Sequence, residues 1–178
     1  KCRVVVALGR VNMLMKLMCL IVTMTAHTIR RVLLAMWVVG SDAKSAFQQM
    51  NTTKSTQHVL TFVTQVAARA STGTPLGHKN APQAFCQEVD SMKTTCKDTV
   101  THIDDFYNLG MTYYAAMLEF IKWMKECEKK NLLLAAKKFQ PFLRKMKFVG
   151  LVKEGSKCHM DPKRTHPLDQ MKRPKKGV

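Results

Sequence analysis

Two adjacent aspartates, Asp104 and Asp105, lie inside an otherwise apolar run that favours β-structure, from Val100 to Phe106. Strands normally exclude aspartate, and a second carboxylate beside the first adds like-charge repulsion. The pair is tolerated most easily at the tip of a tight hairpin, where both carboxylates face water or a cation. Such a pair, joined by a third carboxylate, can bind two divalent ions roughly 3.5–4 Å apart and support in-line phosphoryl transfer. The alternative is an Asp-rich turn without chemistry.

A third carboxylate, Asp42, ends the apolar run that begins at Trp37. This run predicts a buried strand, and an aspartate at a strand end is well placed to meet a hairpin tip on a neighbouring strand. The alternative is that Asp42 caps the turn that follows. Cys158-His159 is the only Cys/His neighbour pair, and no second pair at zinc spacing completes a site.

The spacing of apolar residues predicts the elements that would position these aspartates. Helices are expected over residues 25–36, 82–92 and 111–130. The last of these carries a predicted apolar stripe, made of Met117, Phe120, Ile121, Met124 and Cys127. Residues 43–50 are expected to turn helical around Phe47, and Asp161-Pro162 is typical of a helix start.

Strands are expected over residues 3–6, 37–42, 59–66 and 132–134, with a hairpin over residues 99–109 and a loop over residues 71–77. The expected fold class is α+β. A small antiparallel sheet would carry Asp42 and the hairpin, helices 82–92 and 111–130 would lie behind it, and a smaller region from residues 1–16 and 50–79 would pack alongside.

The chain of 178 residues is strongly basic. It contains 29 Lys and Arg against 12 Asp and Glu, which gives a net charge of +17. This charge exceeds what solubility requires and predicts a polyanionic partner, of which nucleic acid is the commonest. The alternatives are a solvated basic surface or binding to an anionic membrane surface.

No membrane-spanning or secretory segment is predicted. Residues 14–24 are apolar but contain Lys16, and they are too short to span a bilayer or to resemble a signal peptide. Six cysteines without a C-x-x-C motif favour a reduced, intracellular protein. The chain begins at Lys1 without Met and is interpreted as a fragment of something longer.

The order of the motifs resembles the central part of a reverse transcriptase from a gypsy-type LTR retrotransposon, over nearly all 178 residues. Residues 74–85, Thr-Pro-Leu-Gly-His-Lys-Asn-Ala-Pro-Gln-Ala-Phe, resemble M-P-F-G-L-x-N-A-P-x-x-F and are the most specific match. Further matches are residues 3–12 to the fingers strand, 41–50 to the first palm motif, 102–105 to the aromatic-x-Asp-Asp hairpin, 134–142 to L-x-P-x-K-C-x-F, 148–150 to F-L-G, and 161–163 to D-P-x-K.

The resemblance implies a palm-like antiparallel sheet backed by helices, a reduced fingers region and RNA-directed DNA polymerase activity. Asp42, Asp104 and Asp105 would hold two Mg²⁺ ions, for which Mn²⁺ could substitute. Lys138 would donate a proton to the pyrophosphate leaving group. The implied nucleotide-binding residues are Arg3, Ser45, Ala46, Phe47, Leu76 and Gly77, and the implied primer grip is Phe148, Val149 and Gly150.

The nucleotide-binding residues have distinct implied roles. The guanidinium of Arg3 would contact the incoming triphosphate. Backbone amides near Ser45 and Ala46 would cradle phosphates, and Phe47 would lie under the sugar and exclude a 2′-hydroxyl. Leu76 and Gly77 would line the pocket.

The resemblance also implies a division of the chain and a set of partners. Fingers parts are expected at about 1–16 and 50–79, palm at about 17–49 and 80–150, and the start of the thumb or connection at 151–178. The partners would be an RNA or DNA template with a DNA primer, and a dNTP; no membrane partner is expected. The ribonuclease H and integrase parts of the parent polyprotein would be missing.

Several positions depart from the family pattern. His102 replaces the usual aromatic residue, and further departures are Ala7, Gly9, Thr74, Leu76 and Phe139. The three aspartates are retained. Two interpretations therefore stay open: a polymerase core, which could be degenerate or truncated, and a catalytically inactive retroelement relic that binds nucleic acid through its basic surface.

Overall fold

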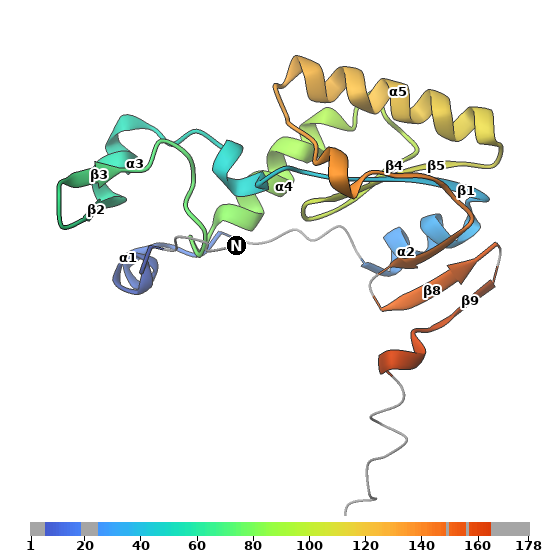
Figure 1. The fold of residues 1–178 in the computed structure, drawn as a ribbon, viewed down its shortest axis with the longest axis horizontal. Coiled ribbons are helices and arrows are strands. Elements are labelled where there is room, and N and C mark those ends of the chain that lie inside the picture. The colour runs from blue at the N-terminus through green and yellow to red at the C-terminus, as the bar shows by residue number, and fades with distance from the viewer. Residues whose placement is uncertain (1–5, 19–24, 149, 156, 165–178) are drawn as a thin grey trace, which may run out of the picture.

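A four-stranded antiparallel sheet forms the centre of the molecule, with the strand order β4-β5-β1-β6 (Figure 1). The computed structural model describes residues 6–18, 25–148, 150–155 and 157–164. The strands are β1 (Trp37–Asp42), β4 (Thr99–His102), β5 (Asp105–Gly110) and β6 (Gln140–Leu143). The predicted strand 37–42, the predicted hairpin and the α+β class are confirmed.

Two helices, α4 (Ala81–Met92) and α5 (Tyr113–Lys129), cover one face of this sheet. Phe106 of β5 packs against Trp123 of α5, with ring centroids 4.8 Å apart, and both side chains are fully buried. The start of α5 lies so close to β5 that a Cβ atom at Gly110 would be 2.3 Å from the backbone nitrogen of Ala116. The predicted apolar face of α4, with Phe85, Val89 and Met92, is confirmed.

The opposite face of the sheet is covered by α2 (Thr25–Leu34) and by a second sheet in the order β7-β8-β9. Its strands are β7 (Lys145–Phe148), β8 (Leu151–Glu154) and β9 (Lys157–Met160). Figure 1 shows α5 above the central sheet and α2 below it. Val32, Val38, Leu109 and Met146 contribute to the second buried cluster. The central sheet therefore lies between two apolar cores.

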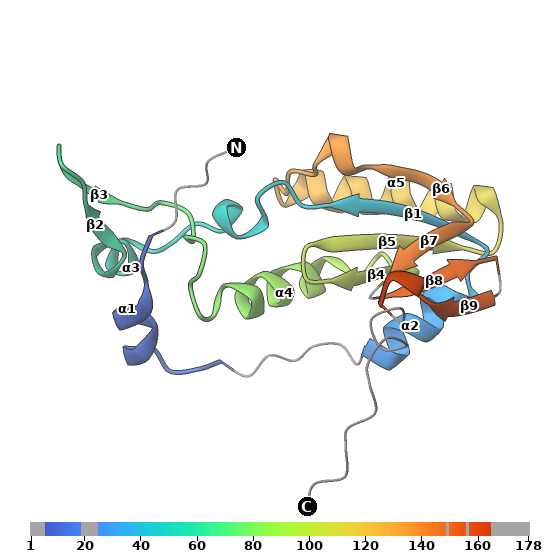
Figure 2. The same ribbon diagram turned by 60° about the horizontal axis from the view of Figure 1, so that its bottom comes forward.

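A smaller group of elements lies at the end of the molecule away from the β7–β9 sheet (Figure 2). It contains α1 (Gly9–Leu14), α3 (Lys54–Val59) and the hairpin of β2 (Thr61–Val63) and β3 (Ala68–Ala70). The loop that follows β3 returns to the main body, where Thr74 N donates to Met50 O at 2.9 Å. Within the described residues, no helix is long and apolar enough to cross a membrane.

The predicted apolar stripe of α5 was right for Cys127, which is buried, but wrong for Ile121 and Met124. The buried residues are Ala116, Glu119, Trp123 and Cys127, whereas Ile121 and Met124 are 41% and 44% exposed. The helix is rotated toward Trp123 because the ring of Phe106 on β5 packs against that side chain. Burying the large indole removes more apolar area from water than burying Ile121 would.

Several predicted elements are shorter than expected or absent. Residues 43–50 form only the 3₁₀ helix η1 (Ala46–Gln49), because Ser45 has left-handed backbone angles that interrupt an α-helix. The predicted strand 132–134 was wrong: Leu134 forms an isolated bridge with Ala43, and Leu133 is 59% exposed. The predicted strand 59–66 is limited to β2.

At the two ends of the chain, part of the prediction lies outside the described residues. This holds for residues 3–5 of the first predicted strand, and Val6 is not in a strand. The helix expected at Asp161-Pro162 begins as predicted with one turn over residues 162–164. The carboxylate of Asp161 accepts from Lys163 N at 3.2 Å, as a helix cap does.

Candidate metal centre

The three aspartates singled out in the sequence meet at one end of the central sheet. Asp42 and Asp105 are the last residues paired between β1 and β5, and the backbone nitrogen of Ala43 donates to Asp104 O at 2.9 Å. One carboxylate oxygen from each of Asp42, Asp104 and Asp105 lies within 4.8 Å of the other two. Antiparallel pairing of two distant segments therefore builds the predicted cluster.

The hairpin that carries Asp104 and Asp105 turns at a strained residue. His102 and Asp105 are the last pair of β4 and β5, and Ile103 between them has φ +56°. A β-branched residue rarely adopts this left-handed conformation, which costs on the order of 1–3 kcal/mol. The tight turn keeps both aspartates at the tip.

The carboxylates of the cluster are partly buried. Asp42 is 6% exposed and Asp105 is half-buried. Burial raises the pKa of Asp105 to about 6, helped by a hydrogen bond with Asp42 and by the charges of Asp104 and Asp42. Three carboxylate oxygens within 4.8 Å of one another form a site that a cation can fill, and an all-oxygen donor set suits Mg²⁺ or Mn²⁺. The residues therefore fit a divalent metal.

A lysine reaches the cluster from a different part of the chain. Lys138 ends the short 3₁₀ helix η2 (Ala136–Lys138), and its Nζ lies 2.8 Å from Asp42 Oδ2. This hydrogen bond raises the pKa of Lys138, although 64% of its side chain stays exposed. The ammonium group is therefore charged beside Asp42 and remains open to a ligand on its other side.

Tyr107 is a neighbour of the site that the sequence reasoning missed. Burial raises its pKa, as do the charge of Asp105 and a hydrogen bond with Asp105. Its ring packs edge-on against Phe148 at 4.9 Å, and Phe148 also contacts the ring of His102 at 6.1 Å. The two-residue alternation of a strand, which puts 105 and 107 on one face, was the signal that could have found it.

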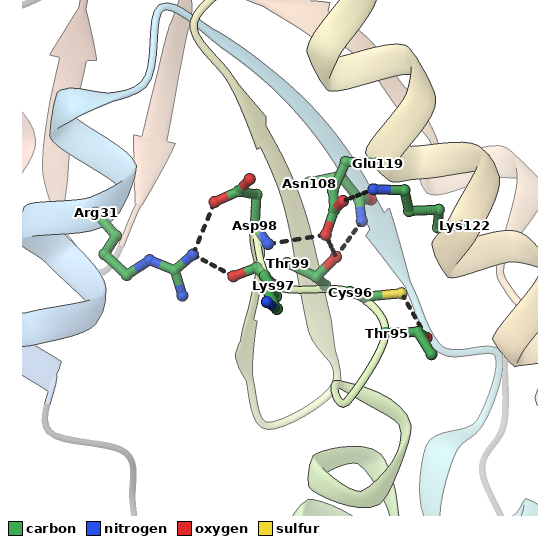
Figure 3. Close-up of polar contacts among 9 residues, drawn as sticks. All are labelled: Arg31, Thr95, Cys96, Lys97, Asp98, Thr99, Asn108, Glu119 and Lys122. Atoms are coloured by element: carbon green, nitrogen blue, oxygen red, sulfur yellow. Dashed lines mark hydrogen bonds and ion pairs between the residues drawn. The ribbon is translucent and has the colours of Figure 1, made fainter.

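A polar network joins the base of the hairpin to α5 (Figure 3). The buried carboxylate of Glu119 accepts from Asp98 N at 2.8 Å and from Thr99 Oγ1 at 3.3 Å. Asn108 Nδ2 donates to Thr99 Oγ1 at 2.8 Å, across the β4–β5 pair. The network fixes the hairpin against the helix. Sequence reasoning missed it because a glutamate on a helix is normally assigned to solvent.

Solved structures with a similar fold were found, although no protein-family profile and no curated protein matches the chain. The foamy viral protease-reverse transcriptase dRH in complex with dsDNA has a TM-score of 0.83 at 17% identity, over 97% of this chain and 30% of that chain. The native prototype foamy virus protease-reverse transcriptase has a TM-score of 0.77 at 19% identity, over 86% of this chain and 21% of that chain.

This chain has a reverse transcriptase fold. It spans about a third or less of the length of the structures that it matches.

Within the reverse transcriptase fold, the residues expected to bind a nucleotide fall into two groups. Ser45, Ala46 and Phe47 lie three to five residues after Asp42, and the half-buried ring of Phe47 packs edge-on against Phe85 at 6.0 Å. Gly77, in contrast, accepts a hydrogen bond from Asn12 Nδ2 at 2.8 Å. The described hydrogen bonds between the loop that contains Leu76 and Gly77 and the rest of the chain run to Asn12, Met50 and Thr52, and none of them reaches the aspartates. Arg3 lies outside the described residues.

The residues expected to form the primer grip lie at the end of β7. Phe148 is buried against Tyr107 and His102. Gly150 occupies the turn before β8 with φ +83°, where glycine is favoured. Val149 lies outside the described residues. Phe148 therefore links the predicted grip to the aspartate hairpin through Tyr107.

Proposed function

We propose that this chain is the fingers and palm part of an RNA-directed DNA polymerase, which transfers nucleotides to a primer. The observation that carries the proposal is the meeting of Asp42, Asp104 and Asp105 on a reverse transcriptase fold. A chance Asp-rich turn does not require a third carboxylate from a strand some sixty residues earlier. The three residues would hold two Mg²⁺ ions, with Mn²⁺ as a substitute.

The chemistry of the bound ions is general to such sites: they would lower the pKa of the primer 3′-hydroxyl and neutralise the triphosphate. The residues of the protein would supply the proton transfer and hold the nucleotide in position. Lys138, charged and held beside Asp42, is in place to donate a proton to the departing pyrophosphate. Phe47, five residues after Asp42 and packed against Phe85, is suited to support the sugar. Ser45 and Ala46 would offer backbone amides to phosphates.

The remaining residues predicted from the motifs keep their proposed roles. Arg3 would contact the triphosphate, and Leu76 and Gly77 would line the nucleotide pocket. Phe148, Val149 and Gly150 would support the primer end. The chain would divide into fingers at about 1–16 and 50–79, palm at about 17–49 and 80–150, and the start of the thumb or connection at 151–178.

The proposed macromolecular partner is an RNA or DNA template with a DNA primer. Two of the similar solved structures are described in complex with dsDNA and with an RNA/DNA hybrid. The net charge of +17 supports a polyanionic partner for this chain as well. We also propose a gypsy-type retrotransposon as the source, on the motif order alone, with an intracellular location and a parent polyprotein that carries ribonuclease H and integrase.

The test is extension of a DNA primer on an RNA template with Mg²⁺ or Mn²⁺. Extension is expected for the wild-type chain once it is joined to a complete thumb, and is expected to disappear when the same protein carries Asp104→Asn. Asp90→Asn is the matched control, because Asp90 is an aspartate of α4 in an ion pair with Lys93 and does not belong to the cluster of three carboxylates.

The second candidate function is an inactive relic that binds nucleic acid through charge alone, and the net charge of +17 favours it. It predicts salt-sensitive binding, no extension with either metal, and the same affinity for nucleic acid in Asp104→Asn as in the wild type, apart from a small effect of charge. Loss of extension in Asp104→Asn alone would exclude it.

A further inference from the structure

One amide side chain fastens the turn after β1 to the segment that leads to Lys138. Gln49, in η1, donates from Nε2 to Lys44 O at 2.6 Å and to Leu133 O at 3.0 Å. Its Oε1 accepts from Leu133 N at 2.7 Å. Both ends of the amide are thus paired, and Leu133 is bonded through its nitrogen and its oxygen to the same side chain.

The backbone beside Gln49 continues this connection toward Asp42. Lys44 N donates to Leu133 O at 2.9 Å, and Ala135 N donates to Asp42 O at 2.8 Å. Ala43 and Leu134 form an isolated antiparallel bridge between these two bonds. A pairing of this length is weak by itself, and the exposed side chain of Leu133 adds little burial. Leu132 and Leu134 pack against the apolar core, and the amide of Gln49 adds side-chain hydrogen bonds at Leu133 between them.

The same segment presents Lys138 to the metal cluster. Lys138 N donates to Ala135 O at 2.9 Å, and its Nζ lies 2.8 Å from Asp42 Oδ2. We propose that Gln49 is a positioning residue that sets where the ammonium group of Lys138 lies relative to Asp42. The inference rests on the proposed function, because it concerns the residues that would hold the divalent ions.

This role predicts that replacing Gln49 raises the affinity of the cluster for a divalent ion, whereas a general defect in folding would lower it. An ammonium group on Asp42 takes up one carboxylate oxygen and repels a divalent cation. If Gln49 is removed, Lys138 is no longer held in place and the cluster should bind a divalent ion more tightly. A residue that merely supported the fold would instead loosen the carboxylates on removal, and binding would weaken.

The first experiment measures Mn²⁺ affinity of the protein without nucleotide, from the electron paramagnetic resonance signal of free Mn²⁺. Lys138→Met is expected to tighten binding by roughly tenfold, as expected for removal of one charge beside a divalent ion. Gln49→Met should tighten it roughly threefold, and the double variant should bind no more tightly than Lys138→Met, because both changes act through one group. Gln48→Met, an exposed glutamine of the same 3₁₀ helix, is the matched control and should behave as wild type.

An unchanged or weaker affinity in Gln49→Met, or full additivity in the double variant, would overturn the positioning role. Circular dichroism checks that each variant is folded. Gln49→Asn is the milder replacement, because its amide is one methylene too short to reach both Lys44 and Leu133, and it should shift affinity in the same direction.

The second experiment needs no metal. Amide hydrogen exchange of residues 132–138 should be at least roughly tenfold faster in Gln49→Met than in the wild type or in Gln48→Met, while exchange in β4 and β5 stays unchanged. Unchanged exchange in residues 132–138 would overturn the inference. If the wild type binds no Mn²⁺, the proposed metal centre fails, and the exchange result still decides whether Gln49 holds the segment. Faster exchange with unaltered Mn²⁺ affinity would show that Gln49 holds residues 132–138 in place but does not set the position of Lys138 relative to Asp42, which would overturn the proposal.

Discussion

Asp42 and Asp105 are directly opposite each other as the final pair of the β1–β5 ladder. Side chains opposite each other on neighbouring strands lie close together, and two carboxylates in this position repel. The pairing is therefore unfavourable for the sheet unless a proton or a cation is shared. Lys138 offsets part of the repulsion from one side. The same geometry that costs stability creates the candidate metal site.

Removal of one ligand should abolish stabilisation by metal. Mg²⁺ or Mn²⁺ at a concentration of roughly 100 times Kd should stabilise the wild type by about 2.7 kcal/mol, because the ion binds only the folded cluster. Asp42→Asn should lose this effect. The measurement is the thermal midpoint with and without metal, with Asp90→Asn as the control. An equal rise in Tm in Asp42→Asn would show that the ion binds elsewhere.

Stability without metal should fall as the pH rises through the titration of Asp105. Its folded-state pKa of about 6 lies above the ordinary value of 3.8, so the folded state keeps a proton that the unfolded state has lost. The free energy of unfolding should decrease between about pH 4 and pH 6 and remain lower above that range. Asp105→Asn should be more stable than the wild type at pH 7, by about 1 kcal/mol for a half-buried group, and should show no such gain at pH 4. Urea denaturation at both pH values measures this difference.

Trp123, rather than the predicted stripe, should dominate the packing of α5. Trp123→Ala is expected to lower the free energy of unfolding by about 3–5 kcal/mol, because the indole is fully buried against Phe106. Met124→Ala, on the neighbouring and partly exposed face, should cost less than about 1 kcal/mol. Denaturant midpoints compare the two variants. Similar losses of unfolding free energy in the two variants would contradict this, and would show that the face with Met124 is packed as the sequence predicted.

The strained turn at Ile103 predicts that glycine stabilises the protein more than alanine does at this position, which is the reverse of the usual order in a strand. Both replacements remove the contacts of the isoleucine side chain, but only glycine removes the cost of φ +56°. Ile103→Gly should therefore be more stable than Ile103→Ala by about 1 kcal/mol. In an ordinary strand, glycine would be the less stable of the two by about 0.5–1 kcal/mol. Thermal unfolding of the two variants without metal decides the sign.

The sequence by itself determined the elements whose signals are local. The apolar run from Trp37 to Asp42 predicted β1, the Asn-Ala-Pro start predicted α4, and the Asp-Asp pair predicted a hairpin tip. Strand alternation, helix capping and turn chemistry act over a few residues, so a single sequence contains them. The motif order added the expectation that the three aspartates converge, and the structure brings them together.

Only the tertiary structure decided which face of α5 is buried, that Gln49 bonds to Leu133, and that Lys138 contacts Asp42 at the end of β1. Trp123 is buried because Phe106 faces it, and Lys138 reaches Asp42 from 96 residues away. The two bonds between Gln49 and Leu133 span 84 residues. A polar side chain has several possible partners of similar energy, and the choice among them is made by the path of the whole chain. Local spacing cannot encode that path, which is why these contacts appear only in the folded molecule.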